Sequence, residues 1–600
     1  MSEETQFYAE DLVKFGSADS RLLLRLLRYL RPYWKMAVLA AVLLLANTAL
    51  MIAIPVVLQR FVDQVLVPRD AGRLWDFTVL VLSLVTAQAV SSAFQSYLFA
   101  WLGQRVMYDI RRDLFSRVIH LPVSYFDKNP VGRLVTRVTN DIGSLNELFA
   151  GGFIQLINDV FLIAFILLTM LFLEWRLGLL ILGLFAVLAG IIWYYSGKIR
   201  GVLRESKRLI ARINAFLNEN ITGMKIIQLF GREGERDKMF REVVGRYTDT
   251  QYGLLSLQSY FLPVSTFFAG CVGALIFWYG GGQVLAGFTT IGTLAAFQTY
   301  SQMLYFPVRT FTDKYNVLLL AFASAERIFT LMDETPEPEP KTGETVPLAP
   351  GKRGEIVFDR VAFGYRSDIQ ALREISFRIA PGERVAVVGA TGAGKTTLVS
   401  LLTRFYDYQG GSIRLDGRDI REIPRGEIRS RVGVVQQDVF LFSGTLLENL
   451  FLPGEWSPDE RRRKAEEIFE ALECTEFLKK LPKGLDTELA ERGGNLSAGE
   501  RQLVAFARLL CFDPEVVILD EATANIDSTT ERLLQRATAR LTRGRTSLLI
   551  AHRLSTILGC DRILVLHHGK LAEEGTHEEL LAKGGIYAKL YTLQFQQQAV

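Results

Sequence analysis

Long apolar runs fill the first half of the chain, whereas short apolar stretches between polar ones fill the second half. A helix needs roughly 20 apolar residues to cross about 30 Å of hydrocarbon. Five stretches in the first half carry at most one charge, and the last of them has room for two helices around a glycine-rich turn. Six membrane spans are therefore predicted, at about 36–58, 77–104, 148–173, 177–197, 254–279 and 291–315.

Positive charges between the spans give the orientation. Successive segments from the N-terminus contain 6, 3, 7, 1, 12 and 0 Lys and Arg residues. Cytoplasmic loops are enriched in these residues, so the segments with 6, 7 and 12 are predicted to face the cytoplasm. Both termini are then cytoplasmic. The acidic N-terminus shows no cleavable signal, and the predicted location is the inner membrane of a bacterial cell, crossed several times.

Helical periodicity continues outside the spans. Apolar residues recur at helical spacing in 106–121 and 199–216, which predicts helices that project into the cytoplasm and turn near Pro130 and Gly223. Residues 1–35 are predicted to form a cytoplasmic segment ending in a helix at the membrane surface. On that helix Arg21, Arg25 and Arg28 are expected to face lipid headgroups or, alternatively, to begin the next helix.

Asp159 is the one charge within the third span. A carboxylate at membrane depth is costly, so it is expected to face the bundle interior or a water-filled cavity. Two interpretations stay open: contact with a substrate or ion, and a structural carboxylate that is protonated or hydrogen-bonded.

A proline-rich and charged connector at 333–350 separates the two halves. The predicted membrane domain is 36–332 and the second domain is 351–600. Residues 1–331 contain 32 Lys and Arg against 24 Asp and Glu, while the remainder contains 36 against 40. The excess in the first half belongs to its cytoplasmic loops, so the basic residues give no support for nucleic-acid binding.

A phosphate-binding loop opens the second domain. Arg384–Gly389 has the pattern of a buried strand, the sequence GATGAGKT follows, and an apolar helical stretch comes next. This context identifies a P-loop. Its backbone N–H groups and helix N-terminus favour phosphate, Lys395 reaches the β- and γ-phosphates, and the Thr396 hydroxyl binds Mg²⁺.

Two further strands end in candidate catalytic residues. Val516–Leu519 leads to Asp520, a predicted Mg²⁺ ligand, and to Glu521, the predicted general base. Thr546–Ile550 leads to His552, which is placed to contact the γ-phosphate. Ligands of open α/β sheets collect at the carboxyl ends of strands, so these residues are expected at one edge.

The second half resembles the nucleotide-binding domain of ATP-binding cassette (ABC) proteins. The signature segment here is LSAGE at 496–500, and the P-loop and the Asp520–Glu521 pair occur in the family's order. The resemblance implies ATP and Mg²⁺ as cofactors, Glu521 and His552 as catalytic residues, and Thr396, Gln437 and Asp520 around Mg²⁺. The residues that it implies for ATP are Tyr365, Gly389, Ala390, Thr391, Gly392, Ala393, Gly394, Lys395, Thr396, Thr397, Gln437, Ser497, Gly499 and Asp527.

The first half resembles the six-helix domain of type IV ABC exporters, through YFDKNPVGRLVTRVTND and ENITGMKIIQLFG. The fold class is therefore a six-span α-helical membrane domain fused to a cytoplasmic α/β P-loop ATPase domain. The expected function is ATP-driven export of hydrophobic or amphipathic substrates, drugs or peptides, by one half-transporter in the lipid bilayer. A homodimeric lipid flippase and a nucleotide-gated channel or regulator remain alternatives.

The signature departs from the family's LSGGQ. Ala498 adds a methyl group where the backbone approaches phosphate, and Glu500 brings a negative charge near an anion. In these transporters each ATP lies between one subunit's P-loop and the other's signature. A complete P-loop beside an altered signature favours a heterodimer with a second half-transporter. The four cysteines show no CxxC spacing and support neither disulfides nor a zinc site.

Overall fold

The computed structural model describes residues 17–149, 153–337, 353–366, 369–451, 456–520, 528–551 and 554–594. Its contacts divide the chain into two compact units. The first comprises Met1–Leu121 and Asn129–Glu334, and the second comprises Pro122–Lys128 and Thr335–Val600. The predicted domain limits lie close to this division, apart from the short segment Pro122–Lys128.

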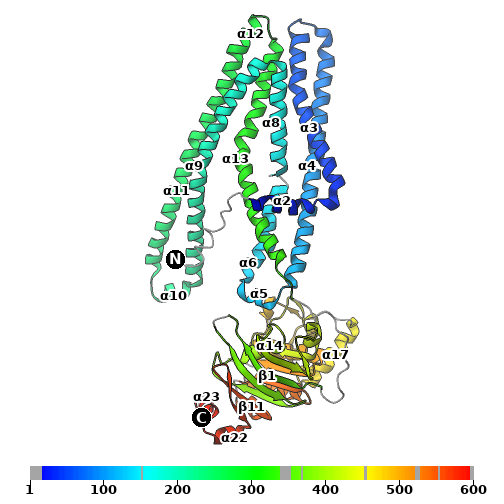
Figure 1. Cartoon of the computed structure of the whole chain (residues 1–600), viewed down its shortest axis with the longest axis vertical. Coiled ribbons are helices and arrows are strands. Elements are labelled where there is room, and N and C mark those ends of the chain that lie inside the picture. Colours follow the sequence, from blue (N-terminus) through cyan, green and yellow to red (C-terminus); the bar gives the residue numbers. More distant parts are fainter. Residues whose placement is uncertain are drawn as a thin grey trace. The chain divides into compact units, whose positions relative to one another are not determined.

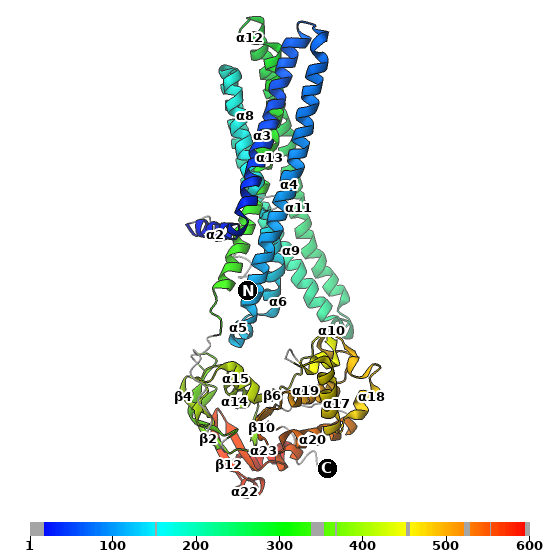
Figure 2. The ribbon, with the colours of Figure 1, turned by 90° about the vertical axis from the view of Figure 1, so that its right-hand side faces the viewer.

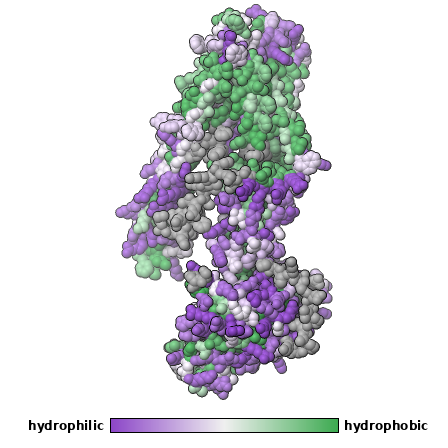
Figure 3. All heavy atoms as spheres, viewed as in Figure 1, coloured by the Kyte–Doolittle hydropathy of each residue, from purple (hydrophilic) through white to green (hydrophobic). Residues whose placement is uncertain are grey.

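Long helices build the first unit (Figure 1). They are α2 (Ser17–Arg28), α3 (Trp34–Phe61), α4 (Leu74–Ile119), α6 (Val131–Thr136), α7 (Ile142–Glu147), α8 (Phe153–Leu173), α9 (Trp175–Thr222), α10 (Met224–Leu229), α11 (Glu233–Leu275), α12 (Gly281–Leu285) and α13 (Ile291–Asp333). Among the described residues, 5 helices are long and apolar enough to cross a membrane. The sixth predicted span, 291–315, lies within α13. An apolar band covers the upper part of the visible face of this unit, and mostly polar surface lies below it, with an apolar patch at the lower left end (Figure 3).

The cytoplasmic extensions are continuous with the spans. α4 runs on to Ile119 and α9 to Thr222, as the helical periodicity predicted. The first extension ends in the short helix α5 (Val123–Lys128), and Pro130 then caps the start of α6. In the second, Gly223 caps the end of α9 and α10 forms the tip.

The arginines of α2 do not share one environment, because Arg25 has a partner within the protein, and the contact with headgroups stays a prediction. α2 crosses the long helices of the first unit (Figure 2). Arg25 donates two hydrogen bonds to Asp333, at 2.6 and 2.8 Å, and its guanidinium lies 4.3 Å from the ring centre of Phe329. Paired charge and ring contact hold it to the end of α13. Arg21 and Arg28 are exposed.

Asp159 is paired with a lysine. Its carboxylate contacts the ammonium of Lys314 from α13, and the two side chains are 9% and 13% exposed. Both charges are thus withdrawn from solvent and satisfy each other, as a buried charge requires. The carboxylate is therefore hydrogen-bonded within the protein, as the structural interpretation of Asp159 expects, and its contact with a substrate or ion stays a prediction.

Two sheets and the helix between them build the core of the second unit. A six-stranded sheet has the order β12-β11-β3-β10-β9-β6, and a four-stranded sheet has the order β2-β1-β4-β5. The strands are β1 (Ile356–Phe363), β2 (Leu372–Ile379), β3 (Arg384–Val388), β4 (Gly410–Leu415), β5 (Arg418–Asp419), β6 (Val432–Val435), β9 (Val516–Asp520), β10 (Thr546–Ile550), β11 (Arg562–His567) and β12 (Lys570–Gly575), with the pair β7 (Gly444–Thr445) and β8 (Glu488–Leu489) apart.

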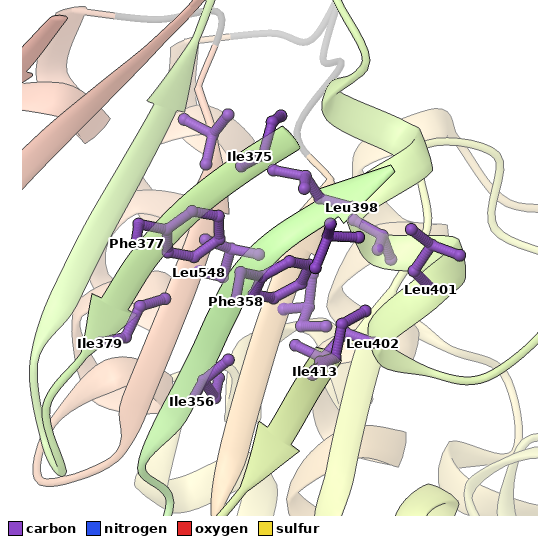
Figure 4. Close-up of a cluster of buried hydrophobic side chains, with 14 of the residues drawn as sticks. Ile356, Phe358, Ile375, Phe377, Ile379, Leu398, Leu401, Leu402, Ile413 and Leu548 are labelled. Atoms are coloured by element: carbon purple, nitrogen blue, oxygen red, sulfur yellow. The ribbon is translucent and has the colours of Figure 1, made fainter. Parts of the chain in front are cut away.

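Helix α14 (Lys395–Leu402) packs between the sheets. Its Leu398, Leu401 and Leu402 join Phe358 and Leu548 in one buried cluster (Figure 4). A second apolar cluster holds the helical part of this unit against the other face of β6, β9 and β10. The remaining helices are α15 (Arg425–Arg431), α16 (Leu446–Leu450), α17 (Pro458–Ala471), α18 (Thr475–Lys480), α19 (Ala498–Phe512), α20 (Ser528–Thr542), α21 (Leu554–Leu558), α22 (His577–Ala582) and α23 (Ile586–Gln594).

Candidate nucleotide-binding site

The carboxyl edge of the six-stranded sheet collects the predicted site. Ile550 of β10 lies opposite Val387 of β3 on one side and Asp520 of β9 on the other. β6 joins in parallel, with Val435 opposite Leu519. The segments that follow these four strands therefore leave the sheet at one edge. They carry the P-loop, Gln437 and the Asp520 carboxylate, together with Glu521, Asp527 and His552, which lie outside the described residues.

Backbone crowding explains two glycines of the P-loop. A Cβ at Gly389 would lie 2.4 Å from the carbonyl oxygen of Leu566. A Cβ at Gly394 would lie 3.0 Å from the carbonyl oxygen of Ala371 and 2.6 Å from the Leu372 side chain, and its φ of 104° disfavours other residues. Gly392 also has a positive φ, of 80°, but a Cβ there would meet nothing within 4 Å. The loop is thus fixed from the protein side and open at Gly392, where phosphate is expected.

Lys395 lies inside the loop. Its ammonium donates hydrogen bonds to the carbonyl oxygens of Gly389, at 2.7 Å, and Ala390, at 3.1 Å. Burial lowers the pKa of Lys395 from its usual 10.5, and the negative charge of Asp520 raises it by a smaller amount. The lysine is thus oriented within the loop, and a bound phosphate would favour its charged form.

The predicted Mg²⁺ ligands are all oxygen donors, which suits this ion. Thr396 is exposed in the first turn of α14, Gln437 is exposed just beyond β6, and Asp520 ends β9. No group of three or more His, Cys, Asp or Glu side chains that could hold a metal occurs in the described part of the chain. A Mg²⁺ that retains water and phosphate ligands needs only one carboxylate, so these residues fit the ion.

Tyr365 stands in an aromatic cluster beside the P-loop helix. Its ring meets those of Phe363 and Tyr406 edge to face, with centres 5.0 Å apart in each pair. Its hydroxyl donates to the Thr397 hydroxyl at 3.3 Å. The side chain is still 44% exposed. This arrangement leaves ring surface exposed, and the stacking of adenine on it stays a prediction of the family resemblance.

The signature segment lies at the start of α19 and outside the core cluster of α14. Ser497 caps the helix, and its hydroxyl accepts from the Glu500 N–H. The Glu500 carboxylate accepts from the Ser497 N–H at 2.8 Å, which completes a capping box. Glu500 therefore has a local structural role that the sequence comparison with LSGGQ did not predict. Ser497 and Ala498 are exposed, whereas Gly499 is buried.

One contact of the site was missed at the sequence level. The hydroxyl of Tyr406, whose ring touches Tyr365, donates to the carboxylate of Asp127 in α5. The two residues are 279 positions apart; Asp127 belongs to the segment YFDKNPVG that carries the family resemblance, whereas Tyr406 belongs to no predicted motif. α5 therefore meets the nucleotide-binding unit at the residue next to the predicted adenine platform.

Family comparisons agree with this architecture. Residues 37–308 match the family described as "ABC transporter transmembrane region", and residues 372–524 match the family described as "ABC transporter". The second match covers the P-loop, the signature and Asp520.

Similar proteins span nearly the whole chain. An "ATP-dependent lipid A-core flippase" of Thiobacillus denitrificans is 34% identical over 96% of this chain and 97% of its own length. A Bacillus subtilis protein named "Probable multidrug resistance ABC transporter ATP-binding/permease protein YheH" is 38% identical over 86% and 77%. A solved bacterial Atm1-family ABC exporter with ATP bound is 26% identical, with a TM-score of 0.74 over 94% of this chain and 98% of that one.

Proposed function

The chain belongs to the ABC transporter family and is an exporter half-transporter, whose ATPase domain couples ATP hydrolysis to transport. We propose that it exports hydrophobic and amphipathic molecules, drugs or peptides, and that it does so as one half of a heterodimer. The observation that best supports an ATP-driven exporter is that the P-loop, Gln437 and Asp520 meet at one edge of a sheet, in a chain whose other half consists of apolar helices.

Each residue of this edge has a proposed role in ATP hydrolysis. Lys395 and the P-loop N–H groups bind the phosphates, and Tyr365 stacks on adenine. Thr396, Gln437 and Asp520 would hold Mg²⁺, which would supply positive charge beside the phosphates. Glu521 takes the proton of the attacking water, and His552 contacts the γ-phosphate. ATP binding closes two nucleotide-binding domains, and the cytoplasmic helices carry this movement to the spans.

The heterodimer rests on the signature. The altered LSAGE is expected to grip ATP less well than LSGGQ, while the P-loop side of this chain is complete. Pairing with a partner of better signature would give one strong and one impaired ATP site. Within the family, this combination resembles the TmrA subunit of the heterodimeric multidrug exporter TmrAB. The capping box keeps Glu500 at the helix N-terminus, so the negative charge remains close to the signature backbone.

Lipid flipping by a homodimer is the second candidate, and a relative named as a lipid A-core flippase favours it. The proposed setting in both cases is the inner membrane of a bacterium, with both termini in the cytoplasm, as the alternation of loop charges predicts.

Transport in sealed vesicles tests the proposal. The chain is purified with its co-purifying partner, reconstituted, and supplied with ATP outside inverted vesicles. A fluorescent amphipathic dye should accumulate against its gradient, and Glu521→Gln should abolish accumulation while ATP still binds. Native mass spectrometry should show a second half-transporter. A fully active homodimer would refute the heterodimer, and flux without hydrolysis would show a channel instead.

A further inference from the structure

A cavity of about 170 Å³ lies within the first unit, among α9, α11 and α13. One wall is apolar and is formed by Leu184, Phe185, Leu188, Phe268, Ala269 and Val272. An apolar cavity of about 150 Å³ lined by such residues accepts a ligand the size of benzene. The cavity can therefore hold one aromatic ring or a short branched alkyl group.

The opposite wall is a polar stripe on α13. Gln298, Ser301, Gln302 and Tyr305 line it at intervals of three and four residues, which places them on one face of the helix. Gln298 lies seven residues after the start of α13 at Ile291, or about 10 Å along the helix. Gln298 is thus in the outer half of the predicted span, and the lining of the cavity on α13 continues to Tyr305 near the middle.

The side-chain oxygen of Gln298 is buried and, among the described residues, has no hydrogen-bond partner. Ser301 does not supply one, because its hydroxyl donates to the main-chain oxygen of Gln298 at 2.8 Å. The amide faces α11, since a Cβ at Gly273 would lie 3.6 Å from this oxygen. A buried acceptor without a donor is costly, especially inside a membrane, where water does not compensate.

We propose that this cavity is a ligand subsite that takes the aromatic or alkyl end of an amphipathic molecule bearing one N–H or O–H donor, with the Gln298 oxygen as the acceptor. The proposal rests on the proposed export function and names a substrate class within it. None of the ten lining residues is charged, so recognition depends on the donor and not on a net positive charge. Peptides, amines and phenols carry such donors.

Two probes of nearly equal shape test the donor. 4-Fluorophenol has a hydroxyl donor and 4-fluorotoluene has a methyl group in its place. Binding of each to the reconstituted complex without ATP is measured by ¹⁹F NMR, corrected for partition into empty bilayers. Satisfying a buried acceptor should make the phenol bind about tenfold more tightly.

Three variants locate the effect. Gln298→Met keeps the length of the side chain but removes the acceptor, and it should abolish the preference for the phenol. Gln95→Met removes another buried amide oxygen that has no partner among the described residues, on α4 and outside this cavity; it is the matched control and should retain the preference. Ala269→Phe fills the apolar wall and should weaken both probes. A preference that survives in Gln298→Met, or its absence in the unmodified complex, overturns the proposal.

Failure of the subsite and failure of export are distinguishable, because the binding measurement requires neither ATP nor flux. A complex that transports amphiphiles but shows no phenol preference refutes the subsite alone. A complex that prefers the phenol through Gln298 but accumulates no dye refutes the export function alone.

Discussion

Removing one hydroxyl from Tyr406 should loosen the contact between α5 and the nucleotide-binding unit without damaging the ATP site. Tyr406→Phe deletes the hydrogen bond to Asp127 but keeps the ring that meets Tyr365 at 5.0 Å. Burial is the largest cause that raises the pKa of Tyr406, and the hydrogen bond to Asp127 is the second. The hydroxyl therefore keeps its proton at physiological pH and acts as the donor. The variant therefore removes a donor and no charge.

The size of the effect follows from exposure. A hydrogen bond to a charged group contributes about 1.5–3 kcal/mol when buried, and Asp127 is exposed, so ~0.5–1.5 kcal/mol is expected here. Since ~1.4 kcal/mol corresponds to tenfold, the contact should weaken by about two- to tenfold. Stimulation of ATP hydrolysis by a transported amphiphile should fall within that range. The KM for ATP should change by less than about twofold, because the aromatic cluster remains.

Tyr408 provides a matched control two residues away. Its hydroxyl also donates to a carboxylate, that of Asp419, but Asp419 lies within β5 of the same unit. Tyr408→Phe should affect thermal stability and leave stimulation intact. Equal loss of stimulation in Tyr408→Phe and Tyr406→Phe, or normal stimulation in Tyr406→Phe, would refute the assigned role of the Asp127 contact. A raised KM with normal stimulation would instead assign the hydroxyl to nucleotide binding.

Three further changes test the site and the membrane unit. Gly394→Ala should abolish ATP binding, because its Cβ would lie 3.0 Å from the carbonyl oxygen of Ala371 at a φ that disfavours side chains. Gly417→Ala also has a positive φ, but it has free space and lies outside the P-loop, so it should keep ATP binding and cost only ~1–2 kcal/mol of stability; nucleotide titration and thermal unfolding separate the two. Asp159→Asn leaves Lys314 buried without its charge partner and should destabilise the membrane unit by ~3–5 kcal/mol. The double variant Asp159→Asn/Lys314→Met removes both charges and should recover this stability, and thermal unfolding in nanodiscs measures both effects. Because burial lowers the pKa of Lys395, ATP affinity should fall at a lower alkaline pH than for an ordinary lysine; a titration of ATP affinity against pH checks this, and affinity that is constant up to the usual 10.5 would contradict it.

Local chemistry made the ATP site predictable. The P-loop needs small residues at fixed positions and a following helix, and the structure supplies the physical reason at Gly389 and Gly394. The strands that precede Gly389 and Asp520 are short, buried and rich in Val and Ile, so their pattern is unambiguous. The long helices follow equally from hydropathy, because the bilayer fixes the length of apolar sequence that a span needs.

Contacts between distant residues were not predictable in this way. Arg25 has the periodicity of a surface arginine, and its actual partner, Asp333, is 308 residues away. The capping box of Ser497 and Glu500 differs, because it is a local pattern three residues long that the sequence contains and that the comparison with LSGGQ overlooked. The pair of Arg25 and Asp333 depends on how elements pack, and the pattern of one sequence contains no signal for it.

Two adjacent residues that follow α14 contact the two places where the chain connects the nucleotide-binding unit to the membrane unit, which are α5 and the start of the linker. Tyr406 binds Asp127 of α5, and the next residue, Asp407, pairs with Arg425 at 3.3 Å. Arg425 also pairs, at 3.1 Å, with Glu337, which lies just after the end of α13.

Burial is the main cause that lowers the pKa of Arg425, and the nearby positive charge of Arg404 is the second. Its two carboxylate partners, Glu337 and Asp407, act in the opposite direction and stabilise the charged guanidinium. Because α14 begins at Lys395, a shift of the P-loop helix when phosphate binds would reach α5 and the linker through neighbouring residues. Glu337→Gln should therefore reduce amphiphile-stimulated ATPase activity without raising the KM for ATP, and together with Tyr406→Phe the loss should exceed that of either change alone. A raised KM in Glu337→Gln would contradict this arrangement, because it would place the linker contact in nucleotide binding itself.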